Sequence, residues 1–243
     1  MDSVETILAI YRELSDAVDT LPVPSGAAVV YNPLVYARRP WERYLRRFAT
    51  PPKRVVFLGM NPGPWGMAQT GVPFGEITAV REWMGIEEAV DQPPAPHPKR
   101  PIQGFACPRS EVSGRRLWGL FSEHSGDAST FFADHLVLNY CPLVYMEESG
   151  RNLTPDKLPA TYRRDLYTLC DSTLRRVVEI LSPEWAVGIG AFAETRLKAS
   201  LDGAIGRAPR IDRILHPSPA SPRANRGWAE EAAGRLRELR VWS

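Results

Sequence analysis

A strand that runs directly into a long Gly/Pro-rich loop constrains this chain more than any other segment. Residues 55–58 form a compact apolar run that fits a strand buried on both faces of a sheet. At Gly59 the run gives way to roughly twenty residues dense in Gly and Pro, which sustain neither a helix nor a ladder and let backbone approach a ligand. Because open α/β sheets place their sites at the carboxyl ends of parallel strands, this loop is a candidate site. A purely structural surface loop is the alternative interpretation.

The polar residues of the loop favour a neutral ligand. Asn61, Gln69 and Thr70 carry amide or hydroxyl groups and no charge. Such a loop can read a neutral heterocycle through hydrogen bonds, and Phe74 offers a flat face for it.

Length and charge set loose bounds on the chain. Its 243 residues suit one α/β domain spanning residues 1–243, with residues 1–24 packing on it as an N-terminal helix. The net charge of +2 permits a polyanionic partner only where basic residues cluster. No stretch approaches the ~18 consecutive apolar residues of a membrane span, and no signal-peptide pattern opens the chain. We therefore expect no membrane partner and an intracellular location, which is the cytoplasm or nucleoid of a bacterium or the nucleus of a eukaryote.

Cysteine and histidine spacing indicates neither a metal nor a disulfide framework. The three cysteines, Cys107, Cys141 and Cys170, are far apart and include no C-x-x-C pair. Buried, reduced thiols are the expected state. The four histidines show no i, i+4 ligand spacing, so we predict no metal and no other cofactor.

Alternating strands and helices predict the fold class. Four strands are expected at residues 55–58, 135–139, 185–190 and 211–215. Helices are expected at residues 2–20, 41–48, 78–86, 111–121, 159–181, 193–199 and 224–239. Residues 25–40 and 91–103 appear irregular, and residues 147–158 read as a polar loop. The pattern predicts a single-domain α/β fold with a four-stranded, mainly parallel sheet flanked by helices.

Three of the predicted strands lead into a single polar residue. These residues are Asn61, Asn139 and His216. Strand ends gather along one edge of a parallel sheet, so we expect the three side chains to converge. Each alone is more often a turn former, but three beside Phe74 favour a site.

The chemistry of these groups suits an amide-like ring such as uracil. Asn139 can donate to O4 and accept from N3–H, and cytosine reverses both groups. Each buried polar group left unpaired costs about 1–3 kcal/mol, which gives discrimination. Phe74 can stack on the base, and His216 can donate to an oxygen that gains negative charge as the base departs.

Several of these segments resemble one known family. Residues 59–75 closely resemble the first motif of the single-strand-selective monofunctional uracil-DNA glycosylases, and residues 216–228 resemble the second. Residues 107–114, 139–143 and 149–155 are similar to the segments between them. The resemblance covers roughly residues 25–240 and implies the uracil-DNA glycosylase fold.

The resemblance also implies an activity, which is hydrolysis of the N-glycosidic bond of uracil in single- and double-stranded DNA to leave an abasic site. By position, Asn61 would hold the attacking water and His216 would stabilise the departing anion. The implied substrate-binding residues are Met60, Gly63, Phe74 and Asn139. Gly63, which has no side chain, would leave room for the substituent of 5-hydroxymethyluracil.

The motifs contain neither a nucleophilic lysine nor a carboxylate. Without the lysine we expect no lyase activity. Asn61 cannot act as a general base, so we expect a dissociative reaction in which water traps an oxocarbenium-like sugar.

The second motif predicts the DNA-binding surface. The candidate residues are Ser218, Pro219, Ala220, Arg223, Asn225 and Arg226. Ala220 stands where family members carry an arginine in the segment that wedges into the duplex, and Arg223 or Arg226 is the candidate substitute. Arg207, Arg210 and Arg213 complete a basic neighbourhood around His216. The expected partner is DNA with a flipped uracil, bound by a monomer.

Two competing functions remain open from the sequence, and a third is disfavoured. A related glycosylase could act on deaminated purines such as hypoxanthine or xanthine. A catalytically weak protein could bind damaged DNA. A phosphate-cradling hydrolase is disfavoured because no Gly-Lys-Ser/Thr sequence is present.

Overall fold

The chain is described here by a computed structural model that covers residues 2–203 and 208–242. A parallel sheet lies at its centre, with strand order β3-β2-β6-β7. The strands are β2 (Val55–Gly59), β3 (His135–Asn139), β6 (Trp185–Ile189) and β7 (Arg210–Ile214). All three pairings are parallel, and β2 and β3 are buried along their whole length. The predicted fold class is therefore confirmed.

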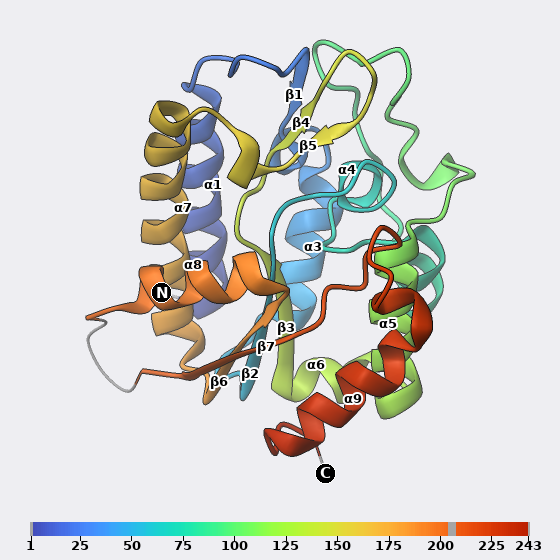
Figure 1. Cartoon of the computed structure of the whole chain (residues 1–243), viewed down its shortest axis with the longest axis vertical. Helices are drawn as coiled ribbons and strands as arrows, with labels where there is room; N and C mark the ends of the chain where they lie inside the picture. Colours follow the sequence, from blue (N-terminus) through green and yellow to red (C-terminus); the bar gives the residue numbers. More distant parts are fainter. Residues whose placement is uncertain (1, 204–207, 243) are drawn as a thin grey trace.

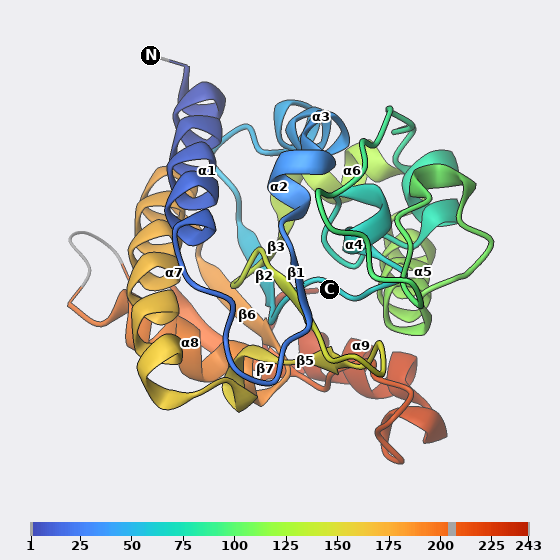
Figure 2. The ribbon, with the colours of Figure 1, turned by 90° about the horizontal axis from the view of Figure 1, so that it is seen from above.

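Helices cover both faces of this sheet (Figures 1 and 2). On one side lie α1 (Ser3–Asp19), α7 (Ala160–Leu181) and α8 (Ala191–Leu201). On the other side lie α5 (Val112–Ser125), α6 (Ala128–Asp134) and α9 (Trp228–Glu238). The N-terminal helix starts at the cap Asp2, whose side chain accepts from the backbone N–H of Val4. It packs on α7, to which the ion pair of Glu13 with Arg176 also joins it.

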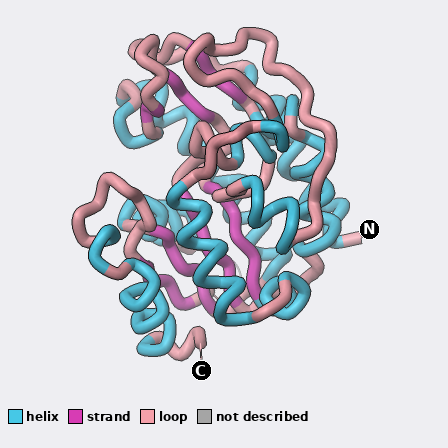
Figure 3. Tube along the Cα trace, turned by 90° about the vertical axis from the view of Figure 1, so that its right-hand side faces the viewer, coloured by secondary structure: helices cyan, strands magenta, loops and turns pink. Residues whose placement is uncertain are grey.

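A second, smaller sheet lies beyond the carboxyl ends of the parallel strands, at the top of Figures 1 and 3. It is antiparallel, in the order β1-β4-β5, with strands β1 (Val29–Tyr31), β4 (Val144–Met146) and β5 (Asn152–Leu153). Residues 25–40 and 147–158 were expected to be irregular, and that expectation was wrong where these strands and α2 (Pro33–Tyr36) form. Strands of two or three residues are too short to show a hydrophobic period.

Other boundaries differ from the prediction in small ways. Residues 78–86 form a π-helical turn, Ala79–Trp83, rather than a longer helix. A short helix, α4 (Met67–Thr70), lies within the Gly/Pro-rich loop. The closing helix is preceded by a separate 3₁₀ turn, Ala224–Arg226. The three cysteines are free and buried, as expected. In the described part of the chain, no helix combines the length and apolar character that crossing a bilayer requires.

The edge strand β3 is closed by a side chain from α3 (Arg38–Phe48). The hydroxyl of Tyr44 donates to the carbonyl of Val137 at 2.9 Å and accepts from its N–H at 3.3 Å. Tyr44 is fully buried among aromatic rings, including that of Phe132. One hydroxyl therefore satisfies both backbone groups that an open sheet edge would leave unpaired.

Tyr44→Phe should lower the free energy of unfolding by about 1–3 kcal/mol, because the buried N–H and carbonyl of Val137 lose their partner. Urea denaturation measures this change. The matched control is Tyr11→Phe in the same aromatic layer, and it should cost clearly less. Equal costs for the two variants would contradict the edge-closing role.

Candidate active site

The segments that carry Asn61 and Asn139 are held together by backbone pairing that continues past the ends of β2 and β3. Gly59 and Asn139 are register partners at the ends of β2 and β3. The backbone N–H of Tyr140 donates to the carbonyl of Gly59 at 3.0 Å, and that of Cys141 donates to Met60 at 2.9 Å. The ladder thus runs past the strands and fixes the start of the Gly/Pro-rich loop against the segment after β3.

Gly59 lets two functional side chains approach each other across the sheet edge. A Cβ at this position would stand 2.5 Å from Cε2 of Phe74 and would overlap Oδ1 of Asn139. Because no side chain can fit there, the Phe74 ring and the Asn139 amide lie on either side of a bare Cα. Close packing of this kind is a use of glycine that no other residue can supply.

The backbone of Phe74 is strained and is held by its surroundings. Its φ of 52° lies in the left-handed region, which costs a non-glycine residue about 1–2 kcal/mol. The indole N–H of Trp118 donates to its carbonyl at 3.0 Å. The hydroxyl of Thr70 holds the next carbonyl, that of Gly75, at 3.0 Å. The ring centroid lies 6.0 Å from that of His216.

The Asn139 amide presents an unused acceptor. Its Nδ2 donates to the sulfur of Met67 at 3.2 Å, which orients the group. Its Oδ1 is buried and has no hydrogen-bond partner. Buried amide oxygens in folded proteins are nearly always paired, so this atom is set up for a ligand donor.

The Asn61 amide is anchored through its amino group. Its Nδ2 donates to the carbonyl of Leu143 at 3.2 Å and to that of Pro62 at 3.4 Å. Both bonds use the amino group, which leaves the carbonyl oxygen to accept from a water or a ligand.

His216 follows β7 and carries a neutral imidazole at neutral pH. Burial lowers its pKa to about 4. Gly190, with a φ of +97°, lies against it, since a Cβ there would stand 3.2 Å from the Cβ of His216. The indole N–H of Trp228 donates to the carbonyl of Leu215 at 2.6 Å and so fixes the preceding residue.

These side chains border a cavity of about 330 Å³. Its lining comprises Met60, Asn61, Gly63, Pro64, Phe74, Glu111, Ser113, Asn152, Thr154, His216 and Ser218. The structure thus brings together six of the predicted site residues, and Asn139 lies directly behind the lining against Gly59 and Phe74.

Five lining residues were not predicted individually. Four of them lie in segments that carried the family resemblance but had no assigned role: Pro64, Ser113, Asn152 and Thr154. Glu111 corrects the expectation that the site has no carboxylate, because it reaches the cavity from the N-cap position of α5. Burial, together with the nearby charge of Glu76, raises its pKa to about 7. Its side chain makes no capping hydrogen bond, and the direction in which it points depends on tertiary packing that the sequence does not show.

The predicted DNA-binding segment is a self-bonded loop at the rim of the cavity. Asn225 donates through Nδ2 to the carbonyl of Pro219 at 2.9 Å. Arg116 of α5 donates to the carbonyl of Pro217 at 3.2 Å and to Oδ1 of Asn225 at 2.9 Å. Ser218 lines the cavity, whereas Pro219 and Ala220 are exposed. Arg116 is therefore the clamp of this loop, a role that the sequence did not indicate.

The basic neighbourhood of His216 is less free than predicted. Arg213 pairs with Glu194 at 3.0 Å, and Arg223 pairs with Glu231 at 2.9 Å. The guanidinium of Arg210 lies over the ring of Trp185. Arg226 is exposed. Arg207 falls outside the described residues.

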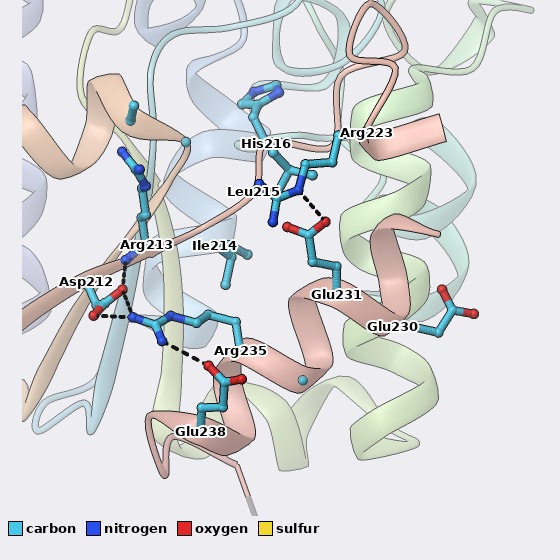
Figure 4. A pocket seen from close by; sticks show the side chains of 13 residues that line it. Asp212, Arg213, Ile214, Leu215, His216, Arg223, Glu230, Glu231, Arg235 and Glu238 are labelled. Atoms are coloured by element: carbon cyan, nitrogen blue, oxygen red, sulfur yellow. Dashed lines mark hydrogen bonds and ion pairs between the residues drawn. The ribbon is translucent and has the colours of Figure 1, made fainter. Parts of the chain in front are cut away.

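A larger cavity of about 730 Å³ lies on the other side of His216, between β7 and α9 (Figure 4). Its cations are matched by carboxylates, because Arg235 binds Asp212 at 2.8 Å and Glu238 at 2.9 Å. In Figure 4 the His216 ring points away from these ion pairs. His216 lines both cavities, but only the smaller of the two also has Asn61 and Phe74 in its lining and Asn139 behind it, so the smaller one is the candidate active site.

Trp65 in the first motif forms a cationic stack beside the cavity. The guanidinium carbon of Arg109 lies 4.7 Å from its ring centroid, and that of Arg100 lies 5.1 Å away. Stacks of this kind present positive charge and a flat face together.

Comparison with known proteins identifies the family to which this fold and this cavity belong. The model of the Uracil DNA glycosylase superfamily matches residues 47–237. The chain is 48% identical, over 97% of its length and 83% of the relative's, to the single-strand selective monofunctional uracil-DNA glycosylase of Rattus norvegicus. It is 47% identical, over 93% of its length and 83% of the relative's, to the protein of that description from Bos taurus. The crystal structure of wild-type Pedobacter heparinus SMUG2 has the same fold, with a TM-score of 0.65 at 15% identity over 94% of this chain and 99% of that one.

The His216 imidazole should stay neutral until the pH falls to about 4, because the cavity wall excludes water from the charged form. Since its pKa is lowered from 6.5 by folding, its contribution to stability is present above pH 6.5 and is lost as the pH falls toward 4. NMR titration of the ring resonances measures the pKa. Burial also lowers the pKa of His135 to about 4, so a His216→Asn variant is needed to assign the signals. A midpoint near 6.5 for His216 would contradict the expectation.

Proposed function

The chain belongs to the single-strand selective monofunctional uracil-DNA glycosylases of the Uracil DNA glycosylase superfamily, and on this premise we propose how its cavity removes uracil from DNA. Members of this family are hydrolases of N-glycosyl bonds, and this chain is one of them. The proposed reaction hydrolyses the bond between uracil and its deoxyribose and leaves an abasic site. The observation that carries the assignment of roles is the buried, unpartnered Oδ1 of Asn139 beside the Phe74 ring.

Asn139 selects uracil by its pairing edge. Oδ1 accepts from N3–H of the base, and Nδ2 turns its donor toward O4. The bond from Nδ2 to the Met67 sulfur supports this orientation, because a thioether is a weak acceptor that leaves the amide free to bond more strongly elsewhere. Cytosine presents an acceptor at N3 and a donor at C4, so both contacts fail. Phe74 stacks on the base from the other side of Gly59.

His216 stabilises the departing base. A neutral imidazole has one N–H, and that donor bonds to the oxygen on which negative charge grows as the glycosidic bond lengthens. Its low pKa supports a hydrogen-bonding role rather than proton transfer, since a group with a pKa of about 4 is a poor reservoir of protons at neutral pH.

Asn61 holds the water that completes hydrolysis. Its amino group is tied to Leu143 and Pro62, so its Oδ1 accepts from the water and aims it at the sugar. An amide does not deprotonate that water, so bond cleavage precedes water attack and the sugar passes through an oxocarbenium-like state. No lysine lines the cavity among the described residues, which supports hydrolysis without lyase chemistry.

The finer features of the function are part of the same proposal. The substrates include 5-hydroxymethyluracil, and the DNA is single- or double-stranded. The protein acts as a monomer in base excision repair, in the cytoplasm or nucleoid of a bacterium or in the nucleus of a eukaryote. The rim loop with Ser218, Pro219, Ala220 and Asn225 contacts the strand around the flipped base. Arg226 is exposed and serves as a phosphate contact, whereas Arg223 must first leave Glu231. No metal or other cofactor takes part.

The first test is base release from oligonucleotides that carry one uracil, 5-hydroxymethyluracil, thymine or hypoxanthine. Uracil and 5-hydroxymethyluracil should be released and thymine should not, with no change on adding chelator. Release of hypoxanthine in place of uracil would favour the deaminated-purine alternative. Tight binding to uracil-containing DNA without release would move the protein to the damage-binding class.

His216→Ala should lower kcat by about 10²–10³-fold while the Kd for uracil-containing DNA changes much less, because the lost donor acts mainly in the transition state. Single-turnover kinetics and fluorescence anisotropy measure the two quantities. Equal losses in both would remove His216 from the anion-stabilising role.

Asn139→Asp should lower kcat/KM for uracil by at least about tenfold, because a carboxylate offers no donor to O4. Its protonated form can donate to N3 of cytosine, so weak cytosine release should appear at low pH. An unchanged rate on uracil would end the proposal that this residue reads the pairing edge.

A further inference from the structure

The space above Gly63 is occupied by another side chain. The resemblance to the family places Gly63 at the 5-position of the base and implies that its missing side chain leaves room. In the structure, a Cβ on Gly63 would overlap Oε1 of Glu111, and a Cβ on Gly66 would overlap Oε2. The carboxyl of Glu111 therefore lies across the turn formed by residues 63–66, in the position that a larger residue at Gly63 would fill.

This carboxyl lacks the compensation that buried carboxyls normally have. Its Oε2 is buried and has no hydrogen-bond partner. It makes no ion pair within the described residues, and its charged neighbour is another carboxylate, that of Glu76. The result is a pKa raised to about 7, so an appreciable fraction of the group is uncharged at neutral pH. A polar atom left unpaired at the wall of a cavity indicates a ligand contact.

We propose that the Glu111 carboxyl reads the substituent at the 5-position of the flipped base, accepting a hydrogen bond from a hydroxyl and disfavouring an alkyl group. This inference rests on the proposed function, because it requires a uracil ring bound with its 5-position toward Gly63. Its substrate class is uracils that carry a hydrogen or an uncharged polar group at C5.

The selection follows from what each substituent does to Oε2. The hydroxyl of a 5-hydroxymethyl group donates to this oxygen and satisfies it. A methyl group offers no donor, so this buried oxygen stays unpaired and keeps a cost of about 1–3 kcal/mol that the hydroxyl removes. A 5-carboxyl group brings a second negative charge against Glu111 and Glu76 and is repelled. Unsubstituted uracil leaves room at the carboxyl for water.

A general-base role for Glu111 predicts a different pattern. A base that activates water acts on the sugar, so its removal slows every substrate by a similar factor. A reader of the 5-position changes the ratio between substrates that differ at C5. The informative pair is 5-hydroxymethyluracil and 5-ethyluracil, which have nearly the same size and differ by the hydroxyl.

The experiment is a double-mutant cycle in which one change removes the substrate hydroxyl and the other removes the Glu111 carboxyl. Base release is measured for uracil, 5-hydroxymethyluracil and 5-ethyluracil with the wild type, Glu111→Ala and Glu111→Gln. In the wild type, kcat/KM for 5-hydroxymethyluracil should exceed that for 5-ethyluracil by at least about tenfold. Glu111→Ala should reduce this ratio to near one. Glu111→Gln retains an acceptor and should preserve most of the ratio.

The control is Glu123→Ala, which makes the same change in the last turn of α5, the helix that Glu111 precedes, and outside this cavity. It should leave the ratio unchanged. A ratio that persists in Glu111→Ala would overturn the proposal, as would similar losses on all three substrates.

The wild-type ratio keeps the proposal testable if the variants fold poorly, because equal rates on 5-hydroxymethyluracil and 5-ethyluracil overturn it without any substitution. Failure of the wild type to release uracil would instead contradict the proposed function. The two failures are therefore distinguishable.

Discussion

The absence of a side chain at Gly59 is the constraint on which the site depends. β2 must end with a bare Cα, because the Phe74 ring and the Asn139 amide meet over it. The consequences spread outward from there. The ring lies here with its backbone at a φ of 52°, and the Trp118 bond to the Phe74 carbonyl helps to hold this strained conformation. A core contact, a strained turn and a recognition group are thus one arrangement, and none of them can change alone.

The same region leaves polar atoms unpaired, which a protein selected for stability alone would avoid. In the described part of the chain, three buried acceptors without partners lie at this cavity, on Glu111, Asn139 and Asn152. Each would cost about 1–3 kcal/mol if it stayed desolvated. The surroundings that tolerate them are rigid, since β2 and β3 are wholly buried and the edge of β3 is closed by Tyr44. The stability of the sheet offsets the cost of leaving these acceptors unpaired when no ligand is bound.

The sequence predicted the parts of the site that depend on local pattern and on the rules of parallel sheets. β3 was predicted with its observed ends, and Asn61 and His216 were predicted to converge because both follow strands of one sheet. Glu111 was missed because its position depends on how α5 packs on the first loop, which is a contact between distant segments. The pairing of Arg213 with Glu194 was missed for the same reason, since the charge of a side chain is visible in sequence and its partner is not.

The two titratable groups of the cavity both have pKa values shifted toward their neutral forms, and this keeps the net charge of the cavity low. Burial lowers the pKa of His216 to about 4 and raises that of Glu111 to about 7. A cationic histidine would attract any phosphate or carboxylate, and a fully charged glutamate would oppose the negative charge of a departing base. With both shifts, a neutral ring enters a nearly neutral cavity, and the main charge that develops is that of the leaving group. Fixed dipoles act most strongly on such a charge where water is excluded, so the burial that shifts both pKa values also strengthens the hydrogen bond from His216.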